Sequence, residues 1–126
     1  MNIENSGLSN NFKQLSIRYD ESHEVLWTCF NQKNMIPCFN HELISELTQH
    51  QIEIQNTAGV LFDGERSRQI KYSVAASITP NVFNLGGHLA MIREFAINKH
   101  REALLNYATK GIDGLVSRLN RFNNSP

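Results

Sequence analysis

Apolar and polar residues alternate between residues 70 and 78, and this pattern predicts a β-strand. One face of the segment carries Ile70, Tyr72, Val74, Ala76 and Ile78. A period of two, with β-branched and aromatic residues, is typical of a strand. From Leu89 to Ile97 the apolar spacing changes to three and four residues, with Leu89, Ile92 and Ala96 on one side. This second pattern predicts a helix that follows the strand after a short loop.

The N-terminal part of the chain predicts a β-hairpin. Residues 12–19 suit a first strand, and residues 24–30 suit a second one after a short polar turn. The second strand contains a nearly continuous apolar run from Val25 to Phe30. Such a run is typical of a strand with both faces covered, so we expect packing on each side of it.

Two longer helices are predicted on either side of the strand at residues 70–78. The first begins after Asn40, a favourable N-cap residue, and stops at Gly59. Its apolar stripe consists of Leu43, Ile44, Leu47 and Ile54. The second runs from Lys99 to Leu119, and its stripe consists of Leu104, Tyr107, Ala108, Gly111, Ile112, Leu115 and Leu119. Gly111 and Gly114 each weaken that helix by roughly 1 kcal/mol relative to alanine, and close approach of a neighbouring backbone is one use for them.

The order of the predicted elements is β-β-α-β-α-α, which predicts an α/β fold with at least one β-α-β crossover between parallel strands. We assign residues 12–120 to this domain. Residues 1–11 are polar and are predicted to form a disordered lead. Residues 121–126 are predicted to form a polar tail.

Charge and hydropathy argue against two classes of partner. Twelve basic and twelve acidic side chains cancel in this chain of 126 residues, so the net charge carries no nucleic-acid footprint. No window is long and apolar enough to predict a membrane span. Arg66, Arg68 and Lys71 form the densest basic patch. This patch is either a solvated loop or a binding site for an anion, such as the phosphates of coenzyme A.

The cysteines and histidines bear on the cellular location of the protein and on metal binding. Cys29 and Cys38 are too few for a disulfide framework, and the N-terminal residues do not resemble a secretory signal. We therefore expect reduced thiols and a cytoplasmic location. The five histidines show no ligand spacing, so no metal site is predicted.

The strand at residues 70–78 and the following helix are joined through Gly86 and Gly87. A helix N-terminus carries backbone N–H groups without internal partners, and glycine leaves them unshielded. Such a place can hold an anion or stabilise a developing oxyanion. From these residues alone, a plain tight turn is the other interpretation.

The run Phe83-Asn84-Leu85-Gly86-Gly87-His88-Leu89 resembles the oxyanion-loop motif of the crotonase (enoyl-CoA hydratase/isomerase) superfamily. Within it, Val-Phe-Asn-Leu-Gly-Gly and the segment Arg101–Ala108 are similar to diffusible signal factor synthases, which make cis-2-unsaturated fatty acid signals for bacterial quorum sensing. The resemblance runs from about Leu15 to about Val116 and covers roughly the first half of a crotonase domain.

The resemblance implies the N-terminal portion of a crotonase-type β-β-α spiral and a role for several residues. The backbone N–H of Gly87 would be one of two donors to the thioester oxygen. Other residues would line the substrate site: Phe83, Leu85, Gly86, Cys38 and Phe39. The substrate would be a fatty acyl thioester of coenzyme A or acyl carrier protein, with no other cofactor. The family also implies a homo-oligomer or a complementary C-terminal half.

Two departures from the family leave the activity open. His88 stands where the family has aspartate, so it is either a gained catalytic group or a tolerated substitution. The second oxyanion donor and the two acid/base glutamates have no counterpart in this chain. The first hypothesis is therefore the N-terminal part of an acyl-thioester hydratase or dehydratase. The alternative is a non-catalytic truncated crotonase that binds a protein or an acyl chain.

Overall fold

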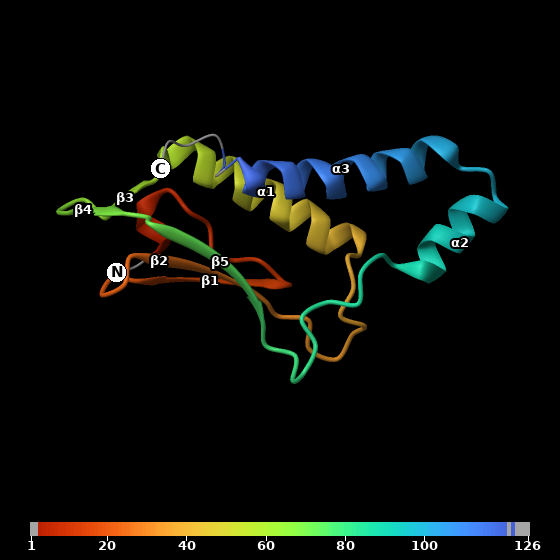
Figure 1. Cartoon of the computed structure of the whole chain (residues 1–126), viewed down its shortest axis with the longest axis horizontal. Helices are drawn as coiled ribbons and strands as arrows, with labels where there is room; N and C mark the ends of the chain where they lie inside the picture. Colours follow the sequence, from red (N-terminus) through yellow and green to blue (C-terminus); the bar gives the residue numbers. More distant parts are fainter. Residues whose placement is uncertain (1–2, 121, 123–126) are drawn as a thin grey trace.

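A computed structural model of the chain describes residues 3–120 and Phe122, and its architecture is mixed α/β, as predicted (Figure 1). In order, the elements are the 3-10 helix η1 (Ile3–Ser6), β1 (Leu15–Asp20), β2 (Val25–Phe30), α1 (His41–Thr57), β3 (Val60–Phe62), β4 (Ser67–Gln69), β5 (Tyr72–Ser77), α2 (Leu89–Ile97) and α3 (Arg101–Leu119).

The larger sheet has the strand order β1-β2-β5. β1 and β2 form the predicted antiparallel hairpin, and Arg18 lies opposite Trp27. β2 and β5 run parallel, with Trp27 opposite Val74, and the connection between them contains α1. The predicted crossover between parallel strands is thus confirmed.

Only one face of this sheet is covered by helices, with α1 and α3 on the same side of it (Figure 1). Leu26, Thr28 and Phe30 of β2 are buried on that side. Val25, Trp27 and Cys29 lie on the opposite face and are only partly buried. The expectation that β2 is covered on both faces is therefore wrong for the described residues, since no helix packs on the second face.

The first long helix follows the prediction closely. The Asn40 side chain caps α1 by accepting a hydrogen bond from the Leu43 N–H at 2.8 Å. The predicted apolar stripe faces the core, where Leu43, Ile44 and Ile54 are buried. The helix ends at Thr57, and Ala58 rather than glycine takes the left-handed C-cap position with φ 52°. Gly59 follows with φ 82°, so the stop needs two successive left-handed residues.

Two short strands lie where the sequence predicts only a turn. β3 and β4 pair as an antiparallel hairpin around Asp63 and Gly64. The Asp63 carboxylate accepts from the backbone N–H groups of Glu65 and Arg66, which closes the turn. Each strand has three residues, and this length is too short for alternation to be recognised in a sequence.

Described residues near both ends of the chain contribute to the core, within the segments predicted as a disordered lead and a polar tail. Ile3 and Leu8 are buried within the main apolar cluster, and Phe122 joins them from the other end. Ser9 donates from its hydroxyl to the Glu53 carboxylate at 2.6 Å and holds the N-terminal segment on α1. The predictions for residues 1–2, 121 and 123–126 lie outside the described residues.

The apolar stripe predicted for the last helix is divided between two faces of α3. Tyr107 is buried, whereas Ile112, Leu115 and Leu119 are exposed. A Cβ at Gly114 would lie 3.0 Å from Nε2 of Gln51, which donates to the Gly114 carbonyl, so this glycine admits a side chain rather than a backbone. α3 therefore packs on α1 along one face and leaves a second apolar face open.

Candidate functional site

The candidate site is formed by the two loops that follow the parallel strands β2 and β5. These loops comprise residues 31–40 and 78–88, and both begin at the carboxyl ends of their strands. Their backbones lie side by side: the Leu85 N–H donates to the Pro37 carbonyl, and the Phe39 N–H donates to the Gly86 carbonyl, each at 2.8 Å. Ligands of open α/β sheets bind at the carboxyl ends of the strands, so this is the expected place for a site.

Tyr107 of α3 joins the two loops through its hydroxyl group. The hydroxyl donates to the Phe39 carbonyl and accepts from the His88 N–H at 3.0 Å. The phenol ring is buried, with 8% of the residue exposed. A single buried side chain therefore satisfies one backbone group in each loop and connects both loops to α3.

The geometry of the glycine pair directs one N–H away from its neighbours. Gly86 has φ +92° and donates its N–H to the Asn84 side chain at 2.6 Å. Gly87 forms an isolated parallel bridge with Phe39. In this bridge Phe39 bonds to the peptide groups that flank Gly87, so the N–H of Gly87 itself points away from Phe39. Within the described chain no acceptor is found for that N–H, and Gly87 is exposed.

His88 is the N-cap residue of α2. Its Nδ1 accepts a hydrogen bond from the Met91 N–H at 3.0 Å. A nitrogen that accepts carries no proton, so this bond requires a neutral ring with its proton on Nε2. The structure thus gives His88 a helix-capping role, which aspartate can also perform.

An open cleft of about 820 Å³ lies between the two loops. Its walls consist of Gln32, Lys33, Asn34, Met35, Ile36, Pro37, Ile78, Thr79, Pro80 and Leu85. Of the predicted substrate-binding residues, Leu85 lines this cleft. Phe83 does not line it and stacks on Phe30 with ring centroids 5.1 Å apart. Cys38, Phe39, Gly86 and Gly87 are not among the lining residues, so the glycine N–H and the cleft are neighbouring features rather than one surface.

Cys38 is a buried residue of the first loop, with 3% of the residue exposed. Burial raises the pKa of its thiol, because the thiolate would lose hydration. The thiol is therefore protonated at neutral pH, which suits a packing role. Both cysteines are free.

Sequence reasoning missed two residues that shape this site. Tyr107 was recognised only as a member of an apolar stripe, although the hydroxyl of a buried tyrosine usually requires a partner. Gln32 was not singled out at all, yet it is buried in the cleft wall with 3% exposed. The polar pair Asn31-Gln32 directly after the apolar run was the available signal for Gln32.

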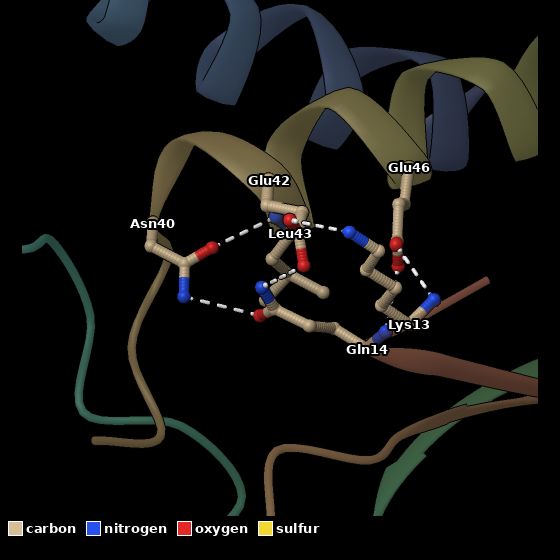
Figure 2. A network of polar contacts seen from close by, with 6 residues as sticks. All are labelled: Lys13, Gln14, Asn40, Glu42, Leu43 and Glu46. Carbon is tan, nitrogen blue, oxygen red and sulfur yellow. Dashed lines mark hydrogen bonds and ion pairs between the residues drawn. The ribbon is translucent and has the colours of Figure 1, made fainter. Parts of the chain in front are cut away.

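The carboxylates at the start of α1 serve the fold. Oxygen atoms of Glu46 accept from the backbone N–H groups of Lys13 and Gln14 at 2.8 and 2.9 Å (Figure 2). Glu42 accepts from the Gln14 side chain at 3.0 Å. These bonds attach the segment before β1 to the first turns of α1, so neither carboxylate faces the cleft as a catalytic group.

The basic patch is largely neutralised by nearby carboxylates. Arg68 pairs with Glu21 at 3.3 Å, and Lys71 pairs with Glu24 at 2.9 Å. These ion pairs favour the interpretation of the patch as a solvated loop over its interpretation as a phosphate-binding site. The described residues contain no group of three or more side chains able to hold a metal ion, and none of their helices is long and apolar enough to cross a membrane.

Comparison with protein-family models found no match, and comparison with curated proteins found none either. The function must therefore be argued from the site.

Proposed function

We propose that this chain binds a fatty acyl thioester and forms the N-terminal part of a crotonase-type hydratase or dehydratase, related to the synthases of cis-2-unsaturated fatty acid signals. The acyl chain would lie in the cleft between the loops, against Met35, Ile36 and Leu85. The thioester oxygen would accept from the Gly87 N–H. We further place the protein in the cytoplasm, where its two thiols would stay reduced.

The free N–H of Gly87 carries this proposal. It lies at the carboxyl ends of two parallel strands, beside an apolar cleft, in a loop braced by Tyr107. A preorganised donor of this kind stabilises a developing oxyanion without reorganisation during the reaction. The strand, glycine pair and helix have the order expected for a crotonase spiral, and this order supports the assignment.

Completion by another polypeptide surface is part of the proposal. The chain exposes 8143 Å², whereas a compact monomer of 14.4 kDa exposes about 6,800 Å². A standard protein interface removes about 800 Å² from each partner. The exposed apolar face of α3 supplies such a surface: Leu105, Ile112, Leu115, Val116 and Leu119. A second copy, or a complementary half that supplies the acid/base groups, would cover it.

A specific observation favours the second candidate, a binding module without catalysis of its own. The ten side chains that line the cleft include no carboxylate and no histidine. Hydration and dehydration need a positioned proton donor and acceptor, which typically contribute 10²- to 10⁴-fold. On this proposal the chain alone binds an acyl thioester without turning it over.

Binding is tested by calorimetric titration of the chain with lauroyl-CoA. We expect saturable binding by the parent and at least tenfold weaker binding by Ile36→Asp, which places a charge on the cleft wall. Ile52→Asp is the matched control, because Ile52 is similarly exposed on α1 but does not line the cleft. Equal affinity of all three proteins, or no saturation by the parent, would contradict the proposal.

Turnover of 3-hydroxylauroyl-CoA separates the enzyme from the binding module. We expect none above background from the chain alone. The variant pair His88→Ala and His88→Asn tests the remaining catalytic candidate, since asparagine keeps the helix cap and removes the imidazole. Activity in the parent that both variants lose would assign acid/base chemistry to His88 and reject the module.

A further inference from the structure

β5 is the last strand of the larger sheet, so one of its edges is free. The N–H groups of Tyr72 and Ile78 face β2 and donate to backbone carbonyl groups at its two ends. Because successive N–H groups of a strand point to opposite edges, those of Ser73, Ala75 and Ser77 point away from β2. Among the described residues, none of these three N–H groups finds an acceptor. A row of unpaired backbone groups is a template for a further strand.

This edge lacks the features that usually prevent pairing between strands. β5 has the sequence Tyr-Ser-Val-Ala-Ala-Ser, without a charged residue or a proline. The opposite edge of the sheet is different, because β1 carries Arg18 and Asp20, and its Ile17 N–H donates to the Asn10 side chain at 2.8 Å. Charged residues and covered backbone groups are common protections of an edge strand. Within the described sheet, β5 is therefore the less protected edge.

The β5 edge is complementary to itself about a two-fold axis through Ala75. Antiparallel pairing with a second copy in this register places Ala75 opposite Ala75 of the partner subunit, and Ser73 opposite Ser77 of the partner subunit. In this register every outward N–H group of both strands finds an acceptor. No like charges meet, since β5 is uncharged. A two-fold contact uses the same surface on both copies, so association through this edge closes at a dimer.

The same register brings apolar side chains together on the face of the sheet that no helix covers. Tyr72 lies at the start of β5 and Ile78 just after its end, and they are 62% and 43% exposed. The axis places Tyr72 opposite Ile78 of the partner subunit, at a non-hydrogen-bonded position where side chains lie close. An aromatic side chain opposite a β-branched one is a stabilising cross-strand pair. Each copy thus covers two exposed apolar side chains of the other.

The exposed area of the chain allows for this interface in addition to the apolar face of α3. It exceeds the area of a compact monomer by more than about 800 Å², which is what a standard interface removes from each partner. We propose that two copies of this chain associate through β5, antiparallel about Ala75, and form one continuous sheet. Because Ile78 lines the cleft, the partner subunit's Tyr72 would extend the cleft wall. This interface does not depend on acyl binding.

Sedimentation velocity tests the interface in the variant Ile112→Lys with Leu115→Lys, which removes association through α3. We expect this background to retain a monomer–dimer equilibrium, with a dimer of twice the chain mass of 14.4 kDa at high concentration. Adding Ala75→Pro should weaken the association at least tenfold, because proline removes an outward N–H and leaves the bonds to β2 intact. Ala75→Ser is the control, since serine keeps that N–H. A background that stays monomeric at every concentration, or equal association of both variants, would overturn the proposal.

Cross-linking tests the register without requiring the proline variant to fold. Chains carrying Tyr72→Cys and chains carrying Ile78→Cys, each with Cys29→Ala, are mixed in the presence of oxidised glutathione. We expect a disulfide-linked dimer with one chain of each kind, identified by mass spectrometry, because the two positions face each other across the axis. Either chain alone is the control and should cross-link far less, since its own two cysteines would lie at opposite ends of the interface. No cross-link, or equal cross-linking of the mixture and the single chains, would overturn the proposal and leave a strand of a different polypeptide as the occupant of this edge.

Discussion

The hydroxyl of Tyr107 donates to the carbonyl of Phe39, although the two residues lie on different elements and far apart in the sequence. The same hydroxyl accepts from the His88 N–H, so the loops that form the candidate site are held by a helix outside the sheet. Substrate-binding loops need such a rigid support if they are to present backbone donors in a fixed direction.

Replacing Tyr107 with phenylalanine should lower the free energy of unfolding by about 1–3 kcal/mol, because the partly buried Phe39 carbonyl and His88 N–H lose their shared partner. Urea denaturation followed by circular dichroism measures the change. Tyr72→Phe is the control, since Tyr72 is 62% exposed, and it should stay within about 0.5 kcal/mol of the parent. Equal effects of the two substitutions would mean that the Tyr107 hydroxyl does not stabilise the loops.

Alanine should have opposite effects at two glycines. Gly86→Ala places a Cβ at φ +92° and should destabilise the fold by roughly 1–2 kcal/mol. In Gly111→Ala, within α3, the added Cβ would meet no atom within 4 Å. This substitution should therefore stabilise the fold by up to about 1 kcal/mol. Thermal unfolding of both variants shows whether each substitution raises or lowers the stability of the fold. A neutral Gly86→Ala would show that the turn before α2 is not constrained as described.

His50 should make the fold sensitive to mild acid. Burial, together with a smaller effect of the Arg118 charge, lowers the pKa of its imidazole to about 4, and the Glu53 carboxylate partly opposes this shift. Its neutral Nε2 lies 2.8 Å from the Thr28 hydroxyl. Because the unfolded chain takes up this proton near pH 6.5 and the folded chain does not, stability is complete above that pH and is lost as the pH falls toward 4.

Between pH 7 and pH 5 the free energy of unfolding should fall by about 2 kcal/mol. Urea titrations at several pH values in this window measure it, and the window avoids most carboxylate titration. His100→Gln, at an exposed position, should retain the slope, whereas His50→Gln should flatten it. A parent whose stability does not change across the window would refute the assignment of a neutral, buried His50.

The exposed face of α3 should cause self-association if no other chain covers it. Sedimentation velocity over a range of concentrations should show species larger than the monomer. Ile112→Lys combined with Leu115→Lys should shift the protein toward monomer, because both side chains are exposed on that face. Asn106→Lys adds a charge elsewhere on the helix and serves as the control. If the parent remains monomeric at the highest concentration, a second copy of the chain is not the partner that covers this face of α3.

Periodicity was sufficient for elements whose apolar residues recur on one face. The alternation at residues 70–78 predicted β5, and three- and four-residue spacing predicted α2 with both of its ends. Asn40 was recognisable as a cap because its side chain acts locally, three residues from its partner. The burial of Ile3 and Leu8 was not predictable in this way, since isolated apolar residues in a polar segment show no period.

The site was harder to predict because its contacts are not local. The loop motif identified Gly86 and Gly87, and the structure places them where a loop meets a helix N-terminus. The backbone bonds from Leu85 to Pro37 and from Phe39 to Gly86 depend on the parallel pairing of β2 and β5. The element order predicts parallel strands, but no spacing along the chain indicates which loop atoms the pairing brings together, nor that one face of β2 lacks a helical cover.

The position of β5 at the end of the strand order has a consequence for amide hydrogen exchange. Tyr72 donates to the Glu24 carbonyl, and Ile78 donates to the Phe30 carbonyl. Since successive N–H groups of a strand point to opposite edges, those of Val74 and Ala76 also face β2. The N–H groups of Ser73, Ala75 and Ser77 then face outward. A deuterium-labelling experiment should therefore show slow and fast amides in strict alternation along β5, and a strand added at this edge would slow the fast set alone.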